Sequence, residues 1–123
     1  MPIKTCQIDC KMKTSKFGTF KRVVIKVGSA LLLDKHGEFN NVWLDNLSSE
    51  ITLLKKSGTE ILIVSSGAVA IGCNILKKSK SQMSLNEMQA AAAMGQAQLV
   101  MKWQDSFKSE SINVAQILLT RSD

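Results

Sequence analysis

Short apolar runs alternate with longer amphipathic segments along this chain. Val23 to Val27 and Glu60 to Val64 are rich in valine and isoleucine, and each is followed directly by small residues that favour a turn. Runs of this kind predict strands of a parallel sheet that is covered on both faces. Ile112 to Leu119 has the same character and predicts a third strand.

Helical spacing marks the segments between these runs. From Trp43 to Ser57, leucine and isoleucine recur every three or four residues, which predicts a helix with one apolar face. An asparagine, Asn40 or Asn41, is placed to cap its start, and Gly58 is placed to end it. A shorter helix is expected from Ala68 to Leu76, and a polar, basic linker follows it.

The longest predicted helix begins at a capping box, the motif formed by Ser84 and Glu87. One stripe of its residues is predicted to face the core: Met88, Ala92, Gly95, Leu99, Trp103 and Phe107. Glycine inside a helix costs about 1 kcal/mol relative to alanine. We therefore expect Gly95 to pack closely against a neighbouring element.

The order of these elements predicts the fold class. Strand, helix, strand, helix, helix and strand follow one another, which is typical of α/β proteins with right-handed connections between parallel strands. We therefore expect an open parallel-type sheet with flanking helices. With 123 residues, of which 45% are hydrophobic, the chain is long enough to bury a core and too apolar to be disordered throughout.

The net charge of +6 is concentrated near the N-terminus. Residues 1–22 hold six basic residues and one acidic residue, whereas residues 23–123 hold ten and nine. Residues 1–21 are therefore predicted to be a basic, disordered leader in front of a nearly neutral domain over residues 22–123. Because basic and aromatic residues are not interleaved, we expect no nucleic-acid partner.

The leader carries two further features. Cys6 and Cys10 are spaced C-x3-C, but neither a second cysteine pair nor a histidine cluster follows, so no metal site is expected. Met12 is an alternative start of the chain. The leader lacks the apolar run of a secretory signal, and the longest apolar stretch, Ile61 to Leu76, is too short and too interrupted for a membrane span. Three cysteines do not make a disulfide framework. We expect a cytoplasmic protein with no membrane partner.

Two strand ends carry the candidate chemistry, because ligands of open α/β sheets bind beyond the carboxyl ends of the strands. At the first, Lys26 offers an ammonium, Gly28 lets backbone amides approach an anion, and Ser29 adds a hydroxyl. The alternative is a strand-end lysine that simply reaches solvent. At the second, Ser66, Gly67 and Ala68 precede or begin a helix, where amides bind carboxylate or phosphate.

Ser66 also has an ordinary interpretation as a helix cap, because serine is common at that position before a helix. Several well-known motifs are absent. Gly67 and Gly72 are not followed by the lysine and hydroxyl residue of a Walker A loop, and no G-x-G-x-x-G dinucleotide fingerprint occurs. His36, the only histidine, lies in a polar segment and is expected to be solvated.

Four segments, taken in order, resemble the amino acid kinase family and, within it, the branch that phosphorylates glutamate. They are KRVVIKVGSALL at residues 21–32, IVSSGAVAIG at 63–72, QAAAAMGQAQL at 89–99 and QILLTRSD at 116–123. The A-x-x-G-Q-x-x-L helix followed by Q-x-L-L-T-R is the more specific part. The resemblance implies the N-terminal part of an amino acid kinase (carbamate kinase-like) fold, either as a stand-alone enzyme or as part of a bifunctional synthase.

The resemblance also implies a reaction and its residues. The γ-phosphate of ATP, accompanied by Mg²⁺, would pass to the side-chain carboxylate of L-glutamate, the first step of proline biosynthesis, with proline as a feedback inhibitor. Lys26 matches the family's catalytic lysine, which contacts the ATP phosphates. Gly28 and Ser29 match the loop around the transferred group, although the family often has threonine at the position of Ser29. Ser66 matches a glutamate-binding serine, with Gly67 and Ala68 beside it.

The family's C-terminal, nucleotide-binding half has no counterpart in this chain. We therefore expect the chain to be inactive alone, as one part of a split or truncated kinase that needs the missing half. A non-catalytic module that binds an amino acid is the alternative interpretation, and a homo-oligomer is compatible with either.

Overall fold

The computed structural model describes residues 20–119. Its elements, in chain order, are β1 (Arg22–Val27), α1 (Ser29–Leu32), α2 (Asn41–Lys56), β2 (Glu60–Ser65), α3 (Ala68–Leu76), the 3-10 turn η2 (Lys80–Gln82) and α4 (Leu85–Lys108). This is an α/β arrangement, as predicted. The expected leader, the Cys6 and Cys10 pair and the alternative start at Met12 lie outside the described residues.

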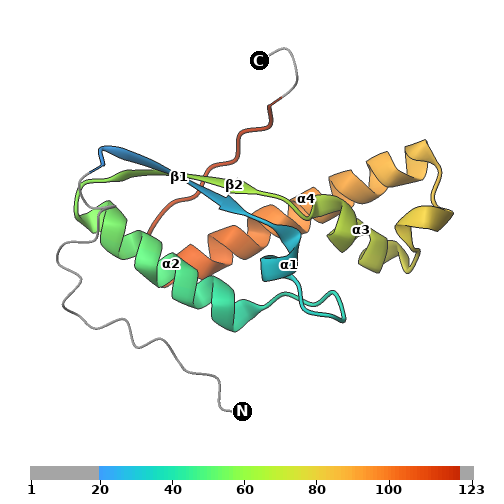
Figure 1. The fold of residues 1–123 in the computed structure, drawn as a ribbon, viewed down its shortest axis with the longest axis horizontal. Coiled ribbons are helices and arrows are strands. Elements are labelled where there is room, and N and C mark those ends of the chain that lie inside the picture. Colours follow the sequence, from blue (N-terminus) through green and yellow to red (C-terminus); the bar gives the residue numbers. More distant parts are fainter. Residues whose placement is uncertain (1–19, 120–123) are drawn as a thin grey trace.

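The two strands form a parallel sheet, of which residues 20–119 cover one face only. β1 pairs with β2 in register from Arg22 opposite Glu60 to Val27 opposite Ser65. Figure 1 shows α2 and α4 on the same side of this sheet. The strands alternate accordingly between half-buried and exposed positions. The prediction of strands buried on both faces is therefore wrong for the described residues, because no helix among them covers the second face.

The core lies between the sheet and these two helices. Its buried residues come from both strand and helix positions: Val27, Leu32, Leu44, Ile51, Ile71, Leu99, Trp103 and Phe107. The rings of Trp103 and Phe107 stack with their centroids 6.3 Å apart. At roughly 1.5–3 kcal/mol for each large apolar side chain removed from water, this cluster is the main source of stability.

Helix α2 (Asn41–Lys56) begins two residues before the predicted Trp43 and ends one residue before the predicted Ser57. The side chain of Asn40 accepts a hydrogen bond from the backbone amide of Trp43, which selects Asn40 over Asn41 as the cap. Gly58 follows the helix with φ of +93°, a left-handed conformation that favours glycine. Leu44 and Ile51 of the predicted apolar face are buried.

Helices α3 and α4 approach so closely that their backbones are in contact. A Cβ added to Gly95 of α4 would overlap the carbonyl oxygen of Ala68 in α3. A Cβ added to Gly72 of α3 would likewise overlap the carbonyl group of Ala91 in α4. The expected close packing at Gly95 is confirmed, and Gly72 is its reciprocal partner. These two glycines fix the start of α3 against the middle of α4.

The buried stripe of α4 is close to the predicted one. Gly95, Leu99, Trp103 and Phe107 are buried as expected. At the start of the helix the buried residue is Ala91, while Met88 and Ala92 are only partly buried. The difference arises because Ala91 faces Gly72 of α3, a contact that the spacing along α4 does not encode.

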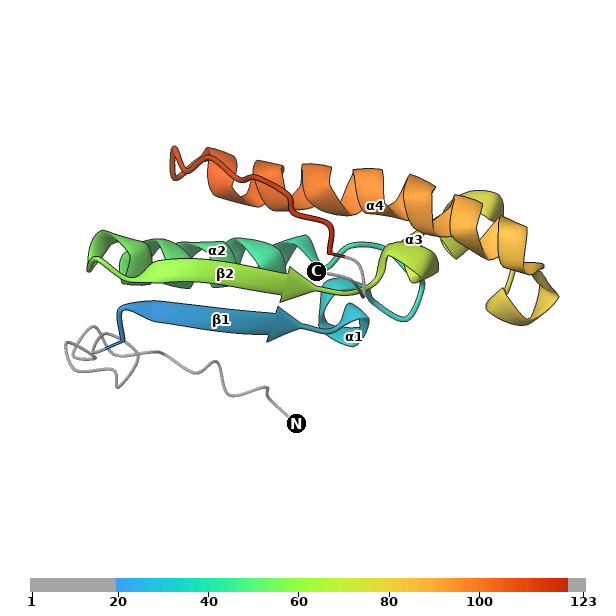
Figure 2. The same cartoon turned by 90° about the horizontal axis from the view of Figure 1, so that it is seen from above.

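The prediction of a third strand at Ile112 to Leu119 is wrong. This segment has no regular secondary structure, and its last backbone hydrogen bond is the one from the amide of Ile112 to Phe107. Figure 2 shows it running between β2 and α4. A groove of about 290 Å³ separates it from β2, with Ile61, Ile63 and Trp103 among its lining residues. Apolar, β-branched residues form a strand only when an edge pairs with them.

None of the helices within residues 20–119 has the length and apolar character needed to cross a membrane.

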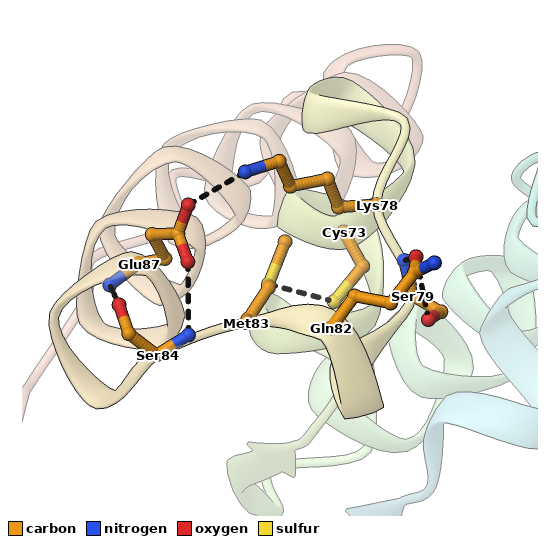
Figure 3. Close-up of polar contacts among 7 residues, drawn as sticks. All are labelled: Cys73, Lys78, Ser79, Gln82, Met83, Ser84 and Glu87. Atoms are coloured by element: carbon orange, nitrogen blue, oxygen red, sulfur yellow. Dashed lines mark hydrogen bonds and ion pairs between the residues drawn. The ribbon is translucent and has the colours of Figure 1, made fainter.

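The turn between α3 and α4 is held by polar contacts, which Figure 3 draws. The predicted capping box is present: the hydroxyl of Ser84 accepts from the amide of Glu87, and the carboxylate of Glu87 accepts from the amide of Ser84 at 2.9 Å. The ammonium of Lys78 donates to the same carboxylate at 2.6 Å. Together these donors lower the pKa of Glu87 to about 2, with Lys78 as the largest cause.

We expect the charge of Glu87 to stabilise the fold in a pH-dependent way. Because its folded pKa lies below the ordinary value of 4.5, the contribution is present above pH 4.5 and is lost as the pH falls towards 2. Glu87→Gln should therefore lower the free energy of unfolding at neutral pH, and this deficit should shrink between pH 4.5 and 3. Urea unfolding at each pH measures it.

Glu50→Gln is the matched control, since Glu50 is exposed and has no ion pair among residues 20–119. A deficit for Glu87→Gln that stays constant from neutral pH to pH 3, or one equal to that of Glu50→Gln, contradicts the prediction.

Gly95→Ala tests the contact between α3 and α4. The added methyl group has no room beside Ala68, so the free energy of unfolding should fall by about 1–3 kcal/mol, although alanine is the better helix former. Gly28→Ala is the control: its φ is −83° and no atom lies within 4 Å of an added Cβ, so its effect should stay within about 0.5 kcal/mol. Equal stability of the two variants in urea contradicts the close contact.

Candidate functional site

The carboxyl ends of β1 and β2 leave the sheet side by side. Val27 is paired with Ser65 in the ladder, so the loops that follow the two strands start from neighbouring points. The amide of Ser66 donates a hydrogen bond to the carbonyl of Val27 at 3.0 Å, and its hydroxyl lies 3.4 Å from the same oxygen. Ser66 therefore joins the two strand ends, and its hydroxyl oxygen keeps lone pairs that can accept a hydrogen bond.

The two predicted loops are in contact beyond this point. A Cβ added to Gly67 would lie 3.3 Å from the Cβ of Ser29 and 3.8 Å from Leu32. The φ of Gly67 is +119°, a conformation that residues with side chains rarely adopt, so this position favours glycine. The structure thus brings Ser29, Ser66, Gly67 and Ala68 together at one end of the sheet.

Backbone amides are available at this end. Gly67 and Ala68 stand at the start of α3, where amides have no partner within the helix, and neither donates a hydrogen bond to any residue of 20–119. Above Gly28 nothing lies within 4 Å of an added Cβ, so the space beside its backbone is open. Free donors, a hydroxyl and open space are the features that an oxyanion requires.

Lys26 supplies the positive charge at this end of the sheet. It lies on the uncovered face of β1, because the side chain of its neighbour Val27 points into the core. Lys26 is exposed and forms no ion pair with the described residues. The sequence-based expectation of a lysine within a buried strand is therefore wrong. The exposed ammonium of Lys26 lies one residue from the strand end and is accessible to an anionic ligand.

Ser65 and Trp103 form a supporting contact that the sequence analysis did not identify. The indole nitrogen of Trp103 in α4 donates a hydrogen bond to the hydroxyl of Ser65 at 3.1 Å. Trp103 was expected only as part of the apolar stripe. Tryptophan is unusual in such a stripe because its N–H needs a partner when buried. That requirement was the available signal, although spacing alone does not identify Ser65 as the acceptor.

The loop after α1 is tied down by Asp34. Its carboxylate accepts hydrogen bonds from the amides of His36 and Glu38 at 2.8 and 3.0 Å. These bonds, the one from Glu38 above all, hold the pKa of Asp34 below its ordinary value. The side chain of Asn74 in α3 then donates to the carbonyl of Gly37 at 2.8 Å. The loop is thereby fixed to α3, which begins at the candidate site, and His36 is exposed as expected.

Two hollows among the described residues lie away from the paired loops. The apolar groove beside β2 reaches them only through Ser65. A second, polar hollow is lined by residues including His36, Glu38 and Cys73, at the far end of α3. Within residues 20–119 no group of three or more histidine, cysteine, aspartate or glutamate side chains is placed to hold a metal ion.

Comparison with known proteins identifies the family to which the chain belongs. The model of the amino acid kinase family matches residues 21–123. The chain belongs to the amino acid kinase family. Among curated relatives, it is 43% identical over 104 residues to a glutamate 5-kinase of Rhizobium rhizogenes (strain K84 / ATCC BAA-868) and 45% identical over 104 residues to one of Allorhizobium ampelinum (strain ATCC BAA-846 / DSM 112012 / S4).

A third relative, glutamate 5-kinase 1 of Rhizobium meliloti (strain 1021), is 45% identical over 104 residues. Each of these alignments covers 85% of this chain, but only 26% or 27% of the relative. This amino acid kinase chain therefore spans about a quarter of the length of the curated relatives that it matches.

A double-mutant cycle tests whether α4 supports the strand end of this amino acid kinase chain. Trp103→Phe removes the indole donor and keeps an aromatic ring, and Ser65→Ala removes the acceptor. The two changes should be non-additive in the free energy of unfolding by about 0.5–1.5 kcal/mol.

Ser57→Ala provides the control cycle with Trp103→Phe, because the hydroxyl of Ser57 donates to Leu54 within α2 and not to the indole. Urea unfolding of each variant measures both cycles. Additive changes in the Ser65 cycle contradict the contact.

Proposed function

We propose that the paired loops beyond β1 and β2 form the phosphate- and glutamate-binding part of a glutamate 5-kinase. The observation that carries the proposal is the juxtaposition of the two loops: Ser29 lies against Gly67, and Ser66 is bonded to the end of β1. The identity to glutamate 5-kinases supports the assignment of the substrate class. Residues 22–123 are then the N-terminal part of the kinase domain, in a cytoplasmic protein.

The reaction transfers the γ-phosphoryl group of ATP to the side-chain carboxylate of L-glutamate. Phosphoryl transfer depends on positioning and on neutralising charge on the transferred group, more than on covalent chemistry of the protein. ATP would supply the phosphoryl group, and a Mg²⁺ ion bound with it would shield the charge of its phosphates. The residues of this chain bind glutamate, the acceptor, and contact one side of the transferred phosphoryl group.

Lys26 is the proposed catalytic residue on this side. Lys26 lies two residues before Gly28, and its exposed ammonium can stabilise the negative charge of the phosphoryl group during transfer. The free space beside Gly28 admits the phosphoryl oxygens, and the hydroxyl of Ser29 can donate to them. The donor set of an ammonium, a hydroxyl and backbone amides fits phosphate well.

Ser66, Gly67 and Ala68 are the proposed residues for glutamate. The amides of Gly67 and Ala68 are unpaired within residues 20–119 and suit a carboxylate, as does the start of helix α3. Because the hydroxyl of Ser66 already contacts the carbonyl of Val27, its oxygen serves as an acceptor for an N–H or O–H group of the ligand. Proline, which shares the α-carboxylate of glutamate, is the proposed competing ligand.

Lys26→Ala tests the proposal when the part of the enzyme that this chain lacks is supplied separately. We expect the 123-residue chain alone not to release ADP when glutamate is added. A mixture with the part of the Rhizobium meliloti glutamate 5-kinase 1 that this chain lacks should do so. Lys26→Ala should then lower kcat/KM by at least about 100-fold, because it removes a charge that faces the transition state.

Lys80→Ala is the control, since Lys80 is an exposed lysine of η2, beyond the far end of α3. It should leave the rate of ADP release unchanged. Glutamate-dependent turnover that is equal in Lys26→Ala and Lys80→Ala contradicts the role of Lys26. Calorimetric binding of glutamate or proline to the chain, with no turnover in any mixture, favours the non-catalytic module instead.

A further inference from the structure

Helix α4 contacts the second loop of the candidate site at both of its ends. The indole nitrogen of Trp103 donates to the hydroxyl of Ser65, the last residue of β2, at 3.1 Å. About two helical turns earlier, Gly95 lies so close to Ala68, the first residue of α3, that an added Cβ would overlap its carbonyl oxygen. Figure 2 shows α4 running past β2 and on along α3. The residues between Ser65 and Ala68 therefore lie between two contacts that the same helix makes.

The contact at Ser65 can form in one direction only. An indole N–H donates and cannot accept, so the hydroxyl oxygen of Ser65 is the acceptor. Trp103 is 5% exposed and belongs to the core cluster, so its ring cannot move with the loop unless the packing of the core changes. The bond therefore ties the end of β2 to the core.

Packing alone does not require an indole at this position of α4. Phe107, one turn after Trp103, stacks against it with the ring centroids 6.3 Å apart and has no polar side-chain atom that needs a partner. A phenylalanine at position 103 would likewise fill the apolar stripe without needing an acceptor. What the indole adds is the hydrogen bond to the end of β2.

Ser66 receives its position from this end of β2. Its amide donates to the carbonyl of Val27 at 3.0 Å, and its hydroxyl lies 3.4 Å from the same oxygen. Both interactions require the backbone to leave the strand in the direction that Ser65 sets. The amides of Gly67 and Ala68 follow directly. A shift at Ser65 would therefore move the whole set of groups that is proposed to bind glutamate.

We propose that Trp103 is a positioning residue for glutamate, which acts through the hydroxyl of Ser65 on Ser66. The inference rests on the proposed function, because it takes its ligand from that site. Both contacts of α4 are with the second loop, whereas the phosphoryl group is proposed to bind at the loop after β1. Trp103 therefore sets the affinity for glutamate and not that for ATP. A merely structural contact would lower stability and leave both affinities unchanged.

Hydrogen exchange of the Ser66 amide, followed by NMR in the 123-residue chain, tests the proposal without a ligand. Trp103→Phe removes the donor and keeps an aromatic ring, and Ser65→Ala removes the acceptor. Each should speed the exchange of this amide by at least about threefold, because its bond to Val27 opens more often. Ser65→Thr keeps the hydroxyl and should exchange at the rate of the unchanged chain.

The KM for glutamate provides the second readout. It is measured as ADP release in the mixture with the part of the Rhizobium meliloti glutamate 5-kinase 1 that this chain lacks. It should rise by about threefold to tenfold in Trp103→Phe and in Ser65→Ala, while the KM for ATP stays the same. The double variant should be no worse than either single variant, because both remove the same bond. Ser65→Thr should restore the KM for glutamate.

Ile51→Val is the control for a loss of stability without a change at the loop. Ile51 is 3% exposed in α2, so the loss of one methyl group weakens the core to an extent comparable with the loss of one hydrogen bond. Urea unfolding of every variant establishes the comparison. Ile51→Val should change neither the exchange of the Ser66 amide nor either KM. If Trp103→Phe does not fold, Ser65→Ala and its rescue by Ser65→Thr decide the test.

Three results would overturn the proposal: unchanged exchange of the Ser66 amide in Trp103→Phe and Ser65→Ala, an unchanged KM for glutamate in these variants, or equal changes in Ile51→Val. Faster exchange at Ser66 has a different meaning if no mixture, even with the unchanged chain, releases ADP when glutamate is added. That result supports the hold of Trp103 on the loop and counts against the proposed function, so the two failures are distinguishable.

Discussion

The parallel pairing of β1 with β2 is the constraint on which the candidate site depends. With Val27 opposite Ser65, both strands end at the same edge of the sheet, and the loops that follow must leave together. Gly67, at φ of +119°, allows the second loop to turn against Ser29 without a side chain in the way. A slip of one residue in this register would separate the two loops and reverse the faces of every strand residue.

Helix α4 holds the two loops in place from the covered side of the sheet. Its glycine contact with Ala68 sets the position of the first residue of α3, and its Trp103 holds the hydroxyl of Ser65 at the end of β2. Both contacts lie directly beside the amides of Gly67 and Ala68, which have no acceptor among residues 20–119. Packing in the core and geometry at the loops are therefore consequences of the same helix, which explains why a glycine and a tryptophan occur on its buried face.

The two faces of the sheet divide the roles of the strands. One face packs on α2 and α4 and supplies the stability of the unit. The other carries Val24, Leu62 and Lys26 outward, so that an apolar surface and a cation are presented together.

Local signals in the sequence determined most of the elements and the candidate residues. The helix caps at Asn40 and Ser84 and the glycine-marked strand ends are short-range patterns, and their physical causes act within a few residues. Only the tertiary structure decided what depends on distant partners. Among residues 20–119, no edge pairs with Ile112 to Leu119, so this segment is not a strand, and nothing covers the face of the sheet that carries Lys26. Ser65 gains its role only when Trp103 is folded against it.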